Sequence, residues 1–580
     1  MVAEPNGGAP SEWRAQAARL LAQGEPEHAV RLLDRAVASA PTDAGAAMDL
    51  ARALYATGRA GAAQQALRAL VGRVPEHAAA WLMLAGLDHS SGDMGSAMRS
   101  LGEARRLRPD DDGMRLVECV FRLPVIYEDT AAIDAARAAY AAGLQDLSAT
   151  IRLDTPARIE AAVGALGTRL PFQLPYQGRN DRALQALHGG LAHRIMAARH
   201  PGLMSSPRPA TGDGRVRVGI LSGFFRRHSN WWMPIRGWLE GLDPARFAVF
   251  GYYTGMERDD VTARAERRCA GFRQGLGRVE AWATAIRDDR LHALLIPEVG
   301  MDAMVFWLSA LRLAPYQAAS WGHPETTGLP TVDAFLSSDA MEPADGTAHY
   351  TEHLVRLPGL SVVLARPETD APPMQRSDVG AGAGSVVFWC CQNLSKYLPE
   401  HDDLFPRIAA ELPDALFLFV GHHRGKRLTA IMQRRMARAF ARHGLPAERH
   451  CRFLRPMPPE RFRSVTRMAD VFLDAIGWSG CNSAIEAIAA GLPIVTQAGS
   501  LMRGRHSTAF LRAMGLEETI ARDVEGVVDL AVALGRDAAR RRHLQEMTAA
   551  RRDRLFDDAA PAAALARHLA ERASAVERMA

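Results

Sequence analysis

The sequence predicts a chain of α-helical repeats followed by two α/β domains, each built around a parallel sheet. Two observations lead to this prediction. Near the N-terminus, glycine, proline, alanine and leucine recur with a spacing of 34 residues. From residue 213 onward, short runs rich in Val, Ile and Phe alternate with longer helical patterns, which is typical of parallel sheets with crossover helices. A chain of 580 residues is also too long for a single hydrophobic core.

The N-terminal repeat has the period and the residue pattern of tetratricopeptide repeats. Gly24, Gly58 and Gly92 are 34 residues apart, and a proline begins each following unit. We therefore predict pairs of helices joined by glycine turns over residues 1–112, with a plain helical bundle as the alternative. Such arrays usually bind a peptide or a partner protein on their concave face. The small and apolar residues that share this register are Ala17, Ala29, Leu33, Ala51, Ala63, Leu67, Ala85, Ala97 and Leu101.

The rest of the chain divides into four parts. Residues 113–212 are predicted to form a helical bridge, residues 213–372 the first α/β domain, residues 373–384 a linker, and residues 385–580 the second α/β domain with terminal helices. Ligands of doubly wound sheets bind at the carboxyl ends of the strands, so we expect one cleft between two Rossmann-like domains. The predicted strands cover residues 216–223, 247–253, 291–297, 316–322 and 332–338, and then residues 385–391, 415–421, 450–456, 470–476 and 492–497.

The composition argues against several classes of protein. The formal net charge of +5 and the pI of about 9.0 are too mild to indicate a nucleic-acid-binding protein. The six cysteines lack the spacing of a metal finger or a C-x-x-C pair, which favours free thiols in a reducing compartment. The N-terminus shows no signal-peptide pattern, and no apolar run approaches the ~20 residues that span a bilayer. We expect a cytoplasmic protein with no membrane span.

Two segments at predicted strand ends of the first α/β domain carry polar residues suited to an active site. His228 lies in SGFFRRHSN directly after the first strand, where a histidine can accept a proton near neutral pH. A hydrogen-bonded loop histidine is the alternative. Glu298 in IPEVGMD, with His323 and Thr327 in WGHPETTGLP, is expected to line the same side of the cleft. For His323, a turn stabilised by its neighbours is the alternative.

In the second α/β domain, one lysine stands out against a background of arginine. The chain holds 68 arginines but two lysines, Lys396 and Lys426. Lys396 lies in CQNLSKYLPE, directly after the first predicted strand of that domain. A lysine at this place can set a compact positive charge beside a leaving diphosphate. An ordinary surface lysine is the alternative.

The strand predicted at 470–476 leads into a glycine-rich turn and a helix that begins near Asn482. The free amides and the positive dipole end of such a helix can hold phosphate, and Glu486 lies one turn further, where it can accept hydrogen bonds from sugar or ribose hydroxyls. Arg503 and Arg505 in LMRGRHSTAFL can contact phosphate or base. The alternatives are an ordinary strand–turn–helix unit and solvated arginines. The segment is neither a P-loop nor a dinucleotide-binding motif.

Taken together, four segments resemble glycosyltransferase family 41, the family of the tetratricopeptide-containing O-GlcNAc transferase and SPINDLY-like proteins. They are RVGILSGFFRRH, LRLAPYQAASWGHPETTGLPTVDAFLSSDAMEP, CQNLSKYLPE and ADVFLDAIGWSGCNSAIEAIAAGLPIVT. The resemblance covers the repeats and nearly all of residues 213–560. It implies a GT-B architecture and an inverting, metal-independent transfer of a sugar from a nucleotide onto Ser or Thr hydroxyls of a protein, with no further cofactor.

The resemblance also implies roles for single residues. His228 matches a loop histidine proposed as the base on the acceptor side, and Lys396 matches a lysine that stabilises the leaving diphosphate. This arrangement requires Lys396 to lie close to the turn at residues 480–483. Cys481 stands where animal relatives carry histidine, and Glu486 stands where they carry aspartate. Together with the residues predicted from their place at strand ends and turns, the predicted acceptor-side residues are Glu298, His323 and Thr327, and the predicted donor-binding residues are Asn393, Gly480, Cys481, Asn482, Ser483, Glu486, Arg503 and Arg505.

We therefore expect a bacterial, cytoplasmic glycosyltransferase whose repeats bind the protein acceptor and whose default donor is UDP-N-acetylglucosamine. No bound metal and no nucleic-acid partner are expected. Other branches of the family imply GDP-fucose or UDP-glucose as alternative donors. A non-catalytic repeat scaffold with a decayed transferase domain, and a transferase that acts on a glycan or lipid, are the competing functions.

Overall fold

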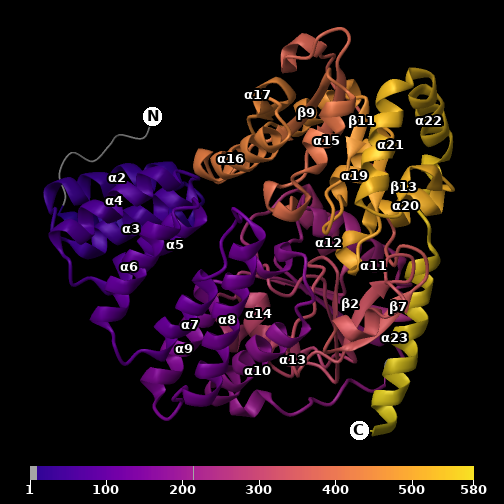
Figure 1. The fold of residues 1–580 in the computed structure, drawn as a ribbon. Coiled ribbons are helices and arrows are strands. Elements are labelled where there is room, and N and C mark those ends of the chain that lie inside the picture. The colour runs from indigo at the N-terminus through magenta and orange to yellow at the C-terminus, as the bar shows by residue number, and fades with distance from the viewer. Residues whose placement is uncertain (1–8, 213, 580) are drawn as a thin grey trace. The chain divides into compact units, whose positions relative to one another are not determined.

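The computed structural model describes residues 9–212 and 214–579, and the chain divides into two compact units between Val125 and Ile126 (Figure 1). The expectation about a signal peptide rests largely on residues 1–8, which lie outside the described residues, as does residue 213 at the predicted start of the first α/β domain. In the part of the chain that the structure describes, no helix is long and apolar enough to cross a membrane.

The first unit confirms the helical repeats. Helix α1 packs on α2, α3 on α4, and α5 on α6. The turns within these pairs hold Gly24, Gly58 and Gly92 at φ angles of 79°, 75° and 87°, a left-handed conformation that favours glycine. All nine alanines and leucines that share the 34-residue register are buried. The helices are α1 (Pro10–Ala22), α2 (Pro26–Ser39), α3 (Ala44–Ala56), α4 (Ala60–Arg73), α5 (Ala78–Ser90), α6 (Met94–Leu107) and α7 (Asp112–Phe121).

The predicted helical bridge is divided between the two units. Helix α7 packs on α6 and belongs to the first unit, whereas α8 (Thr130–Thr150), α9 (Pro156–Thr168) and α10 (Arg182–Arg199) belong to the second. Helix α10 lies directly on the first α/β domain, because a Cβ atom on Gly189 would be 2.2 Å from the carbonyl oxygen of Gly328. This close approach requires glycine, so the bridge is packed onto the domain and is not a loose spacer.

The first α/β domain contains a seven-stranded sheet in the order β3-β2-β1-β4-β5-β6-β7, and all its pairings are parallel. The order reverses between β1 and β4, whose carboxyl ends therefore border a ligand-binding crevice. The five predicted strands are confirmed, while the edge strands β3 and β7 are not among the predicted ones. The strands are β1 (Val216–Ser222), β2 (Phe247–Tyr253), β3 (Gly271–Gln274), β4 (Ala293–Ile296), β5 (Tyr316–Ser320), β6 (Ala334–Ser338) and β7 (His353–Leu357).

The second α/β domain contains a six-stranded parallel sheet in the order β10-β9-β8-β11-β12-β13. Its order reverses between β8 and β11. The five predicted strands are again confirmed, and β13 adds a two-residue edge strand. The strands are β8 (Val386–Cys390), β9 (Ala415–Val420), β10 (Cys451–Leu454), β11 (Val471–Leu473), β12 (Ile494–Gln497) and β13 (Ile520–Ala521).

The last helix corrects the predicted division into domains. Helix α23 (Ala560–Met579) follows the second α/β domain in sequence, but it packs on α11, β1, β4 and β7 of the first (Figure 1). Leu565 and Leu569 are fully buried in that core. An apolar stripe predicts a buried helix face, yet it does not say which domain covers the face.

The remaining helices lie between the strands, except α21 and α22, which follow β13. The predicted linker at 373–384 contains one short 3₁₀ turn, Arg376–Val379, and no strand. These helices are α11 (Arg236–Gly241), α12 (Asp260–Arg268), α13 (Val279–Asp288), α14 (Ala303–Ser309), α15 (Leu404–Glu411), α16 (Lys426–Arg442), α17 (Ala447–His450), α18 (Pro459–Met468), α19 (Asn482–Ala489), α20 (His506–Met514), α21 (Val524–Arg536) and α22 (Ala538–Arg551).

Candidate active site

A single buried carboxylate shapes the turn that follows β11. Asp474 is 5% exposed, and its two oxygens accept five hydrogen bonds. These bonds come from the end of β8, from the turn itself and from β12, so the carboxylate fixes the turn at residues 474–480 against the sheet. The donors, at 2.6–3.0 Å, are the amides of Ala475 and Gly480, the side-chain amide of Gln392, and the hydroxyls of Ser479 and Thr496.

Lys396 reaches this turn from the neighbouring strand β8. Its Nζ donates a hydrogen bond to the carbonyl oxygen of Ser479 at 3.1 Å and lies 5.1 Å from the centroid of the Trp478 ring. Burial lowers the pKa of Lys396 to about 8. The lysine therefore stands against the turn that precedes α19, where the sequence places it.

Helix α19 begins beside the lysine with amides that no side chain caps. Cys481 is the N-cap residue, but its Sγ lies 3.4 Å from Sδ of Met233 and accepts no amide of the helix. Asn482 is exposed and Ser483 is partly exposed. The first-turn amides, together with the helix dipole, can therefore hold an anion. Lys396 and this helix start lie at the carboxyl ends of β8 and β11, the switch point of the sheet.

A cavity of about 500 Å³ opens between the two α/β domains next to this helix start. His228, Trp232 and Met233 line it from the first domain, and Asn482 and Glu486 line it from the second. The segment at residues 364–368 contributes a further wall. A cavity of this volume is within the range that small ligands occupy. The structure thus brings His228 to the same space as the start of α19.

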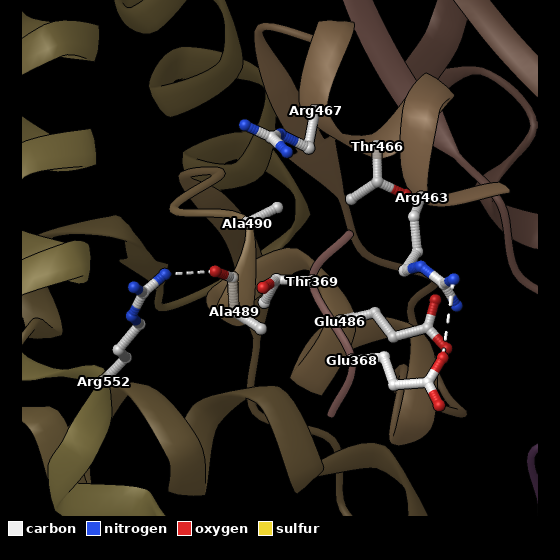
Figure 2. Close-up of a pocket in the computed structure, with 9 residues that line it drawn as sticks. All are labelled: Glu368, Thr369, Arg463, Thr466, Arg467, Glu486, Ala489, Ala490 and Arg552. Carbon is white, nitrogen blue, oxygen red and sulfur yellow. Dashed lines mark hydrogen bonds and ion pairs between the residues drawn. The ribbon is translucent and has the colours of Figure 1, made fainter. Parts of the chain in front are cut away.

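Glu486 lies where this cavity meets a second hollow of about 180 Å³. Figure 2 shows its carboxylate beside that of Glu368, with the guanidinium of Arg463 next to both. The Nη2 of Arg463 lies 3.5 Å from the Glu368 carboxylate. Burial raises the pKa of Glu486, and the charge of Arg463 opposes this shift. That Glu486 accepts hydrogen bonds from a sugar or ribose stays a prediction.

Comparison with known protein families finds one match in the helical repeats and one in the second α/β domain. Residues 20–87 match the model of the tetratricopeptide repeat. Residues 373–562, which contain Lys396, Asp474 and helix α19, match the model of glycosyl transferase family 41. The second α/β domain is a family 41 glycosyltransferase domain. Several relatives support this assignment, at moderate identity.

Two plant proteins, each named as a probable UDP-N-acetylglucosamine–peptide N-acetylglucosaminyltransferase SPINDLY, are similar to this chain. The protein of Petunia hybrida is 27% identical over 256 residues, and the match covers 44% of this chain and 27% of that protein. The protein of Arabidopsis thaliana is 25% identical over 367 residues, and the match covers 62% of this chain and 39% of that protein. The chain therefore spans between about a quarter and two fifths of the length of these relatives.

A solved structure shows the same fold along the whole chain. It is a lysine-to-methionine mutant of the Thermobaculum terrenum O-GlcNAc transferase, with a TM-score of 0.72 and 24% sequence identity. The match covers 98% of each chain. At this identity the likeness shows the fold alone: helical repeats followed by a GT-B-like pair of parallel-sheet domains. The predicted fold class is thereby confirmed.

His228 lines the cavity beside the family 41 domain, but its ring is not arranged as a base. The ring stacks on Phe224 with centroids 4.0 Å apart, and Nδ1 accepts the amide hydrogen of Asn230 at 3.2 Å. Burial lowers the pKa of His228 to about 4, so the ring is neutral near pH 7. A neutral ring whose Nδ1 is an acceptor carries its hydrogen on Nε2, which then donates. The geometry favours a hydrogen-bond donor to a ligand.

Replacement of His228 tests this assignment. We expect His228→Gln, which keeps an N–H donor, to lower kcat less than about tenfold, because loss of a general base would cost about 10²–10⁴-fold. The measurement is kcat for sugar transfer at pH 7 with saturating donor. A loss greater than about a hundredfold for this variant would restore the role of base.

The three residues predicted on the acceptor side support the first α/β domain from within. Glu298 is fully buried, and its Oε1 accepts hydrogen bonds from the hydroxyl of Ser222 at 2.7 Å and the amide of Gly223 at 2.9 Å. Burial raises the pKa of Glu298 to about 8. Thr327 and His323 are also buried. None of the three is among the described residues that line the 500 Å³ cavity, and neither is Lys396, so their contact with an acceptor stays a prediction.

Arg503 occupies a different place from the one the sequence suggests. Its side chain is 4% exposed, and each nitrogen of the guanidinium donates to the protein. The acceptors are the carbonyl oxygens of Pro175 and Arg179 and the carboxylates of Glu325 and Asp181. The guanidinium is therefore committed to protein contacts in place of the predicted contact with phosphate or base.

Two other predicted donor-binding residues keep a free part of their side chains. Asn393 is exposed, and its Oδ1 caps the turn before Lys396 by accepting the amide of Ser395 at 3.0 Å. Arg505 is half-buried, and its Nη1 donates to the carbonyl oxygen of Gly499 at 3.0 Å. Their contacts with a donor stay predictions.

Sequence reasoning missed two residues that organise the family 41 site, Asp474 and Trp478. Asp474 lies inside the strand predicted at 470–476 and directly follows the observed β11, which is the place where carboxyl-end residues of a parallel sheet usually act. That position is a signal for a functional carboxylate that is readable in the sequence. Trp478 is one of ten tryptophans and has no local pattern of its own. Its role becomes visible only through its three-dimensional contacts.

Proposed function

We propose that this chain transfers a sugar from a nucleoside-diphosphate sugar to Ser or Thr hydroxyls of a protein, with UDP-N-acetylglucosamine as the first donor to test. The observation that carries the proposal is the ammonium group of Lys396, placed against the turn before α19 in a family 41 domain. The names of the plant relatives support a peptide acceptor. The tetratricopeptide repeats are the proposed place where that acceptor binds.

In the proposed reaction, the acceptor oxygen attacks the anomeric carbon while the bond from that carbon to the phosphate oxygen breaks. A single in-line displacement inverts the anomeric configuration. Negative charge grows on the departing diphosphate, where Lys396 and the free amides of α19 stabilise it. In this proposal the hydroxyl proton passes to water, because Nδ1 of His228 already accepts the amide hydrogen of Asn230.

This mechanism needs no metal ion. In many transferases a divalent cation neutralises the leaving diphosphate, whereas here Lys396 and the start of α19 supply positive charge at that place. We expect treatment with EDTA to change the rate of transfer less than about twofold. The measurement is the initial rate before and after chelation. A loss of more than about tenfold that Mg²⁺ or Mn²⁺ restores would contradict the mechanism.

We also propose that the protein works in the cytoplasm of a bacterium. The described cysteines form no disulfide with one another, as expected in a reducing compartment. The bacterial Thermobaculum terrenum enzyme shares the fold of the chain over 98% of both lengths. Fractionation of a native host, followed by immunodetection, would test this location.

A donor screen tests the proposed function. The purified chain is mixed with UDP-N-acetylglucosamine, GDP-fucose or UDP-glucose, and thermal shift identifies the donor that binds. Mass spectrometry of proteins co-expressed with the chain then locates the sugar. A sugar on Ser or Thr that depends on Lys396 supports the proposal. Binding of none of the three donors would favour the repeat scaffold, and a sugar found on glycan or lipid would favour the other transferase.

A further inference from the structure

Arg503 joins three parts of the second unit. Its guanidinium extends from the loop between β12 and α20 and is 4% exposed. It donates to the bridge loop between α9 and α10, at 3.1 Å to Pro175 O, 2.7 Å to Arg179 O and 3.0 Å to the Asp181 carboxylate. It also pairs at 2.9 Å with Glu325 of the first α/β domain. One side chain thus links the bridge with both α/β domains.

The backbone of Arg503 continues this connection to Lys396. Its carbonyl oxygen accepts the amide hydrogen of Ser479 at 3.0 Å. The carbonyl oxygen of Ser479 in turn accepts the hydrogen bond from Nζ of Lys396 at 3.1 Å. The backbone of Arg503 is therefore connected to the ammonium group of Lys396 by two hydrogen bonds, both made by Ser479.

The ring of Trp478 provides a second link between the bridge loop and Lys396. Tyr176 of the bridge loop stacks on it, with centroids 4.3 Å apart and planes inclined by 25°. Nζ of Lys396 lies 5.1 Å from the centroid of the same ring, and Cζ of Arg503 lies 5.9 Å from it. The indole is thus held by one aromatic ring and two cations.

We propose that Arg503 is a positioning residue that, with the stack of Tyr176 on Trp478, holds Nζ of Lys396 in place for the leaving diphosphate. The helical bridge thereby becomes part of the active site. The inference rests on the role of Lys396 in the proposed function. Without the contacts of Arg503 and the stack of Tyr176 on Trp478, the turn at residues 477–480 can shift. The ammonium group of Lys396 then moves out of its half-buried place into water.

The lysine content of the chain allows a direct test. Because Lys396 and Lys426 are its two lysines, lysine labelled with ¹³C at Cε gives two signals, and Lys396→Arg assigns them. In Arg503→Met we expect the pKa of Lys396 to rise by more than about one unit toward the ordinary ~10.4, while that of Lys426 stays unchanged. We also expect kcat to fall about 10–100-fold, with a change of less than about threefold in the donor KM.

A matched control and a second variant keep the test decisive. Arg376→Met removes an ion pair of 2.9 Å between the linker and Asp470 of the second α/β domain, and we expect it to leave the Lys396 titration unchanged. Arg503→Met leaves the buried Glu325 carboxylate without its arginine, while Asp181 keeps its ion pair with Arg137, and the substitution can prevent folding. Tyr176→Leu removes the stacked ring without unpairing any charge, and we expect a smaller rise in the Lys396 pKa with about a 3–10-fold loss of kcat.

An unchanged Lys396 titration in folded Arg503→Met and in Tyr176→Leu would overturn the positioning role. A rise of equal size in Arg376→Met would overturn it too, because the effect would then be general. If the wild-type chain transfers no sugar from any donor, the proposed function fails by itself. The lysine titration then still decides whether Arg503 positions Lys396.

Discussion

Replacing Lys396 with alanine is expected to lower kcat about a hundredfold, because losing one contact to the charge that develops in the transition state typically costs ~3 kcal/mol. The ammonium group lies against the turn before α19, where a leaving diphosphate would gather charge. The measurement is steady-state kinetics with saturating donor. Lys426→Ala is the matched control, since that lysine is exposed at the start of α16 and should leave kcat unchanged. A Lys396→Ala variant that turns over within about threefold of wild type would rule out the role.

The same residue predicts a pH dependence. Lys396 is charged below its pKa, which burial lowers to about 8, so kcat/KM should fall as the pH rises through about 8 in the free enzyme. A bound diphosphate favours the charged lysine, so the corresponding limb of kcat should lie at higher pH. Lys396→Arg keeps its charge over this range and should abolish the limb. Persistence of the limb in that variant would assign it to another group.

Replacing Asp474 with alanine is expected to lower the free energy of unfolding by at least about 5 kcal/mol and to abolish donor binding. The buried carboxylate accepts five hydrogen bonds, and each buried donor left unpaired costs about 1–3 kcal/mol. The turn that carries Ser479 and leads to α19 would lose its anchor. Urea unfolding and calorimetric titration with the donor are the measurements.

Two variants serve as controls for Asp474. Asp474→Asn keeps one carbonyl oxygen and the shape of the side chain, and the hydroxyls of Ser479 and Thr496 can rotate to accept its N–H groups. It should therefore lose less stability, about 1–2 kcal/mol. Asp414→Ala removes a carboxylate that is 73% exposed, so its effect on unfolding should be negligible. Equal stability of Asp474→Ala and Asp414→Ala would contradict the anchoring role.

Helices and strands could be predicted from the sequence where their apolar residues form a long run or a regular repeat. Strand β2 is a continuous apolar run, β1 is apolar apart from Arg217 and Ser222, and the repeat helices share a register that buries each of its alanines and leucines. Strand β3 has the sequence GFRQ and β13 has two residues, so neither presents a run that periodicity can detect. The docking of α23 on the first α/β domain depends on tertiary packing, which a stripe of apolar residues does not specify.

The residues of the candidate site also fall into two groups, those that the sequence reveals and those that only the folded structure reveals. Lys396 is visible in the sequence because the chain holds one other lysine, and its position after a strand places it at the switch point. Arg503 is one of 68 arginines, and its partners Glu325 and Asp181 are 178 and 322 residues away in sequence. No local pattern reveals such a long-range pairing. The hydrogen bonds of His228, which decide between base and donor, likewise depend on the folded loop.

The most direct test of the diphosphate site is a crystal structure with UDP or GDP, whichever raises the melting temperature more. We expect oxygens of the diphosphate within about 3.5 Å of Nζ of Lys396 and of the amide nitrogens of the first turn of α19. A diphosphate bound elsewhere, with Lys396 and the start of α19 untouched, would contradict the proposed active site.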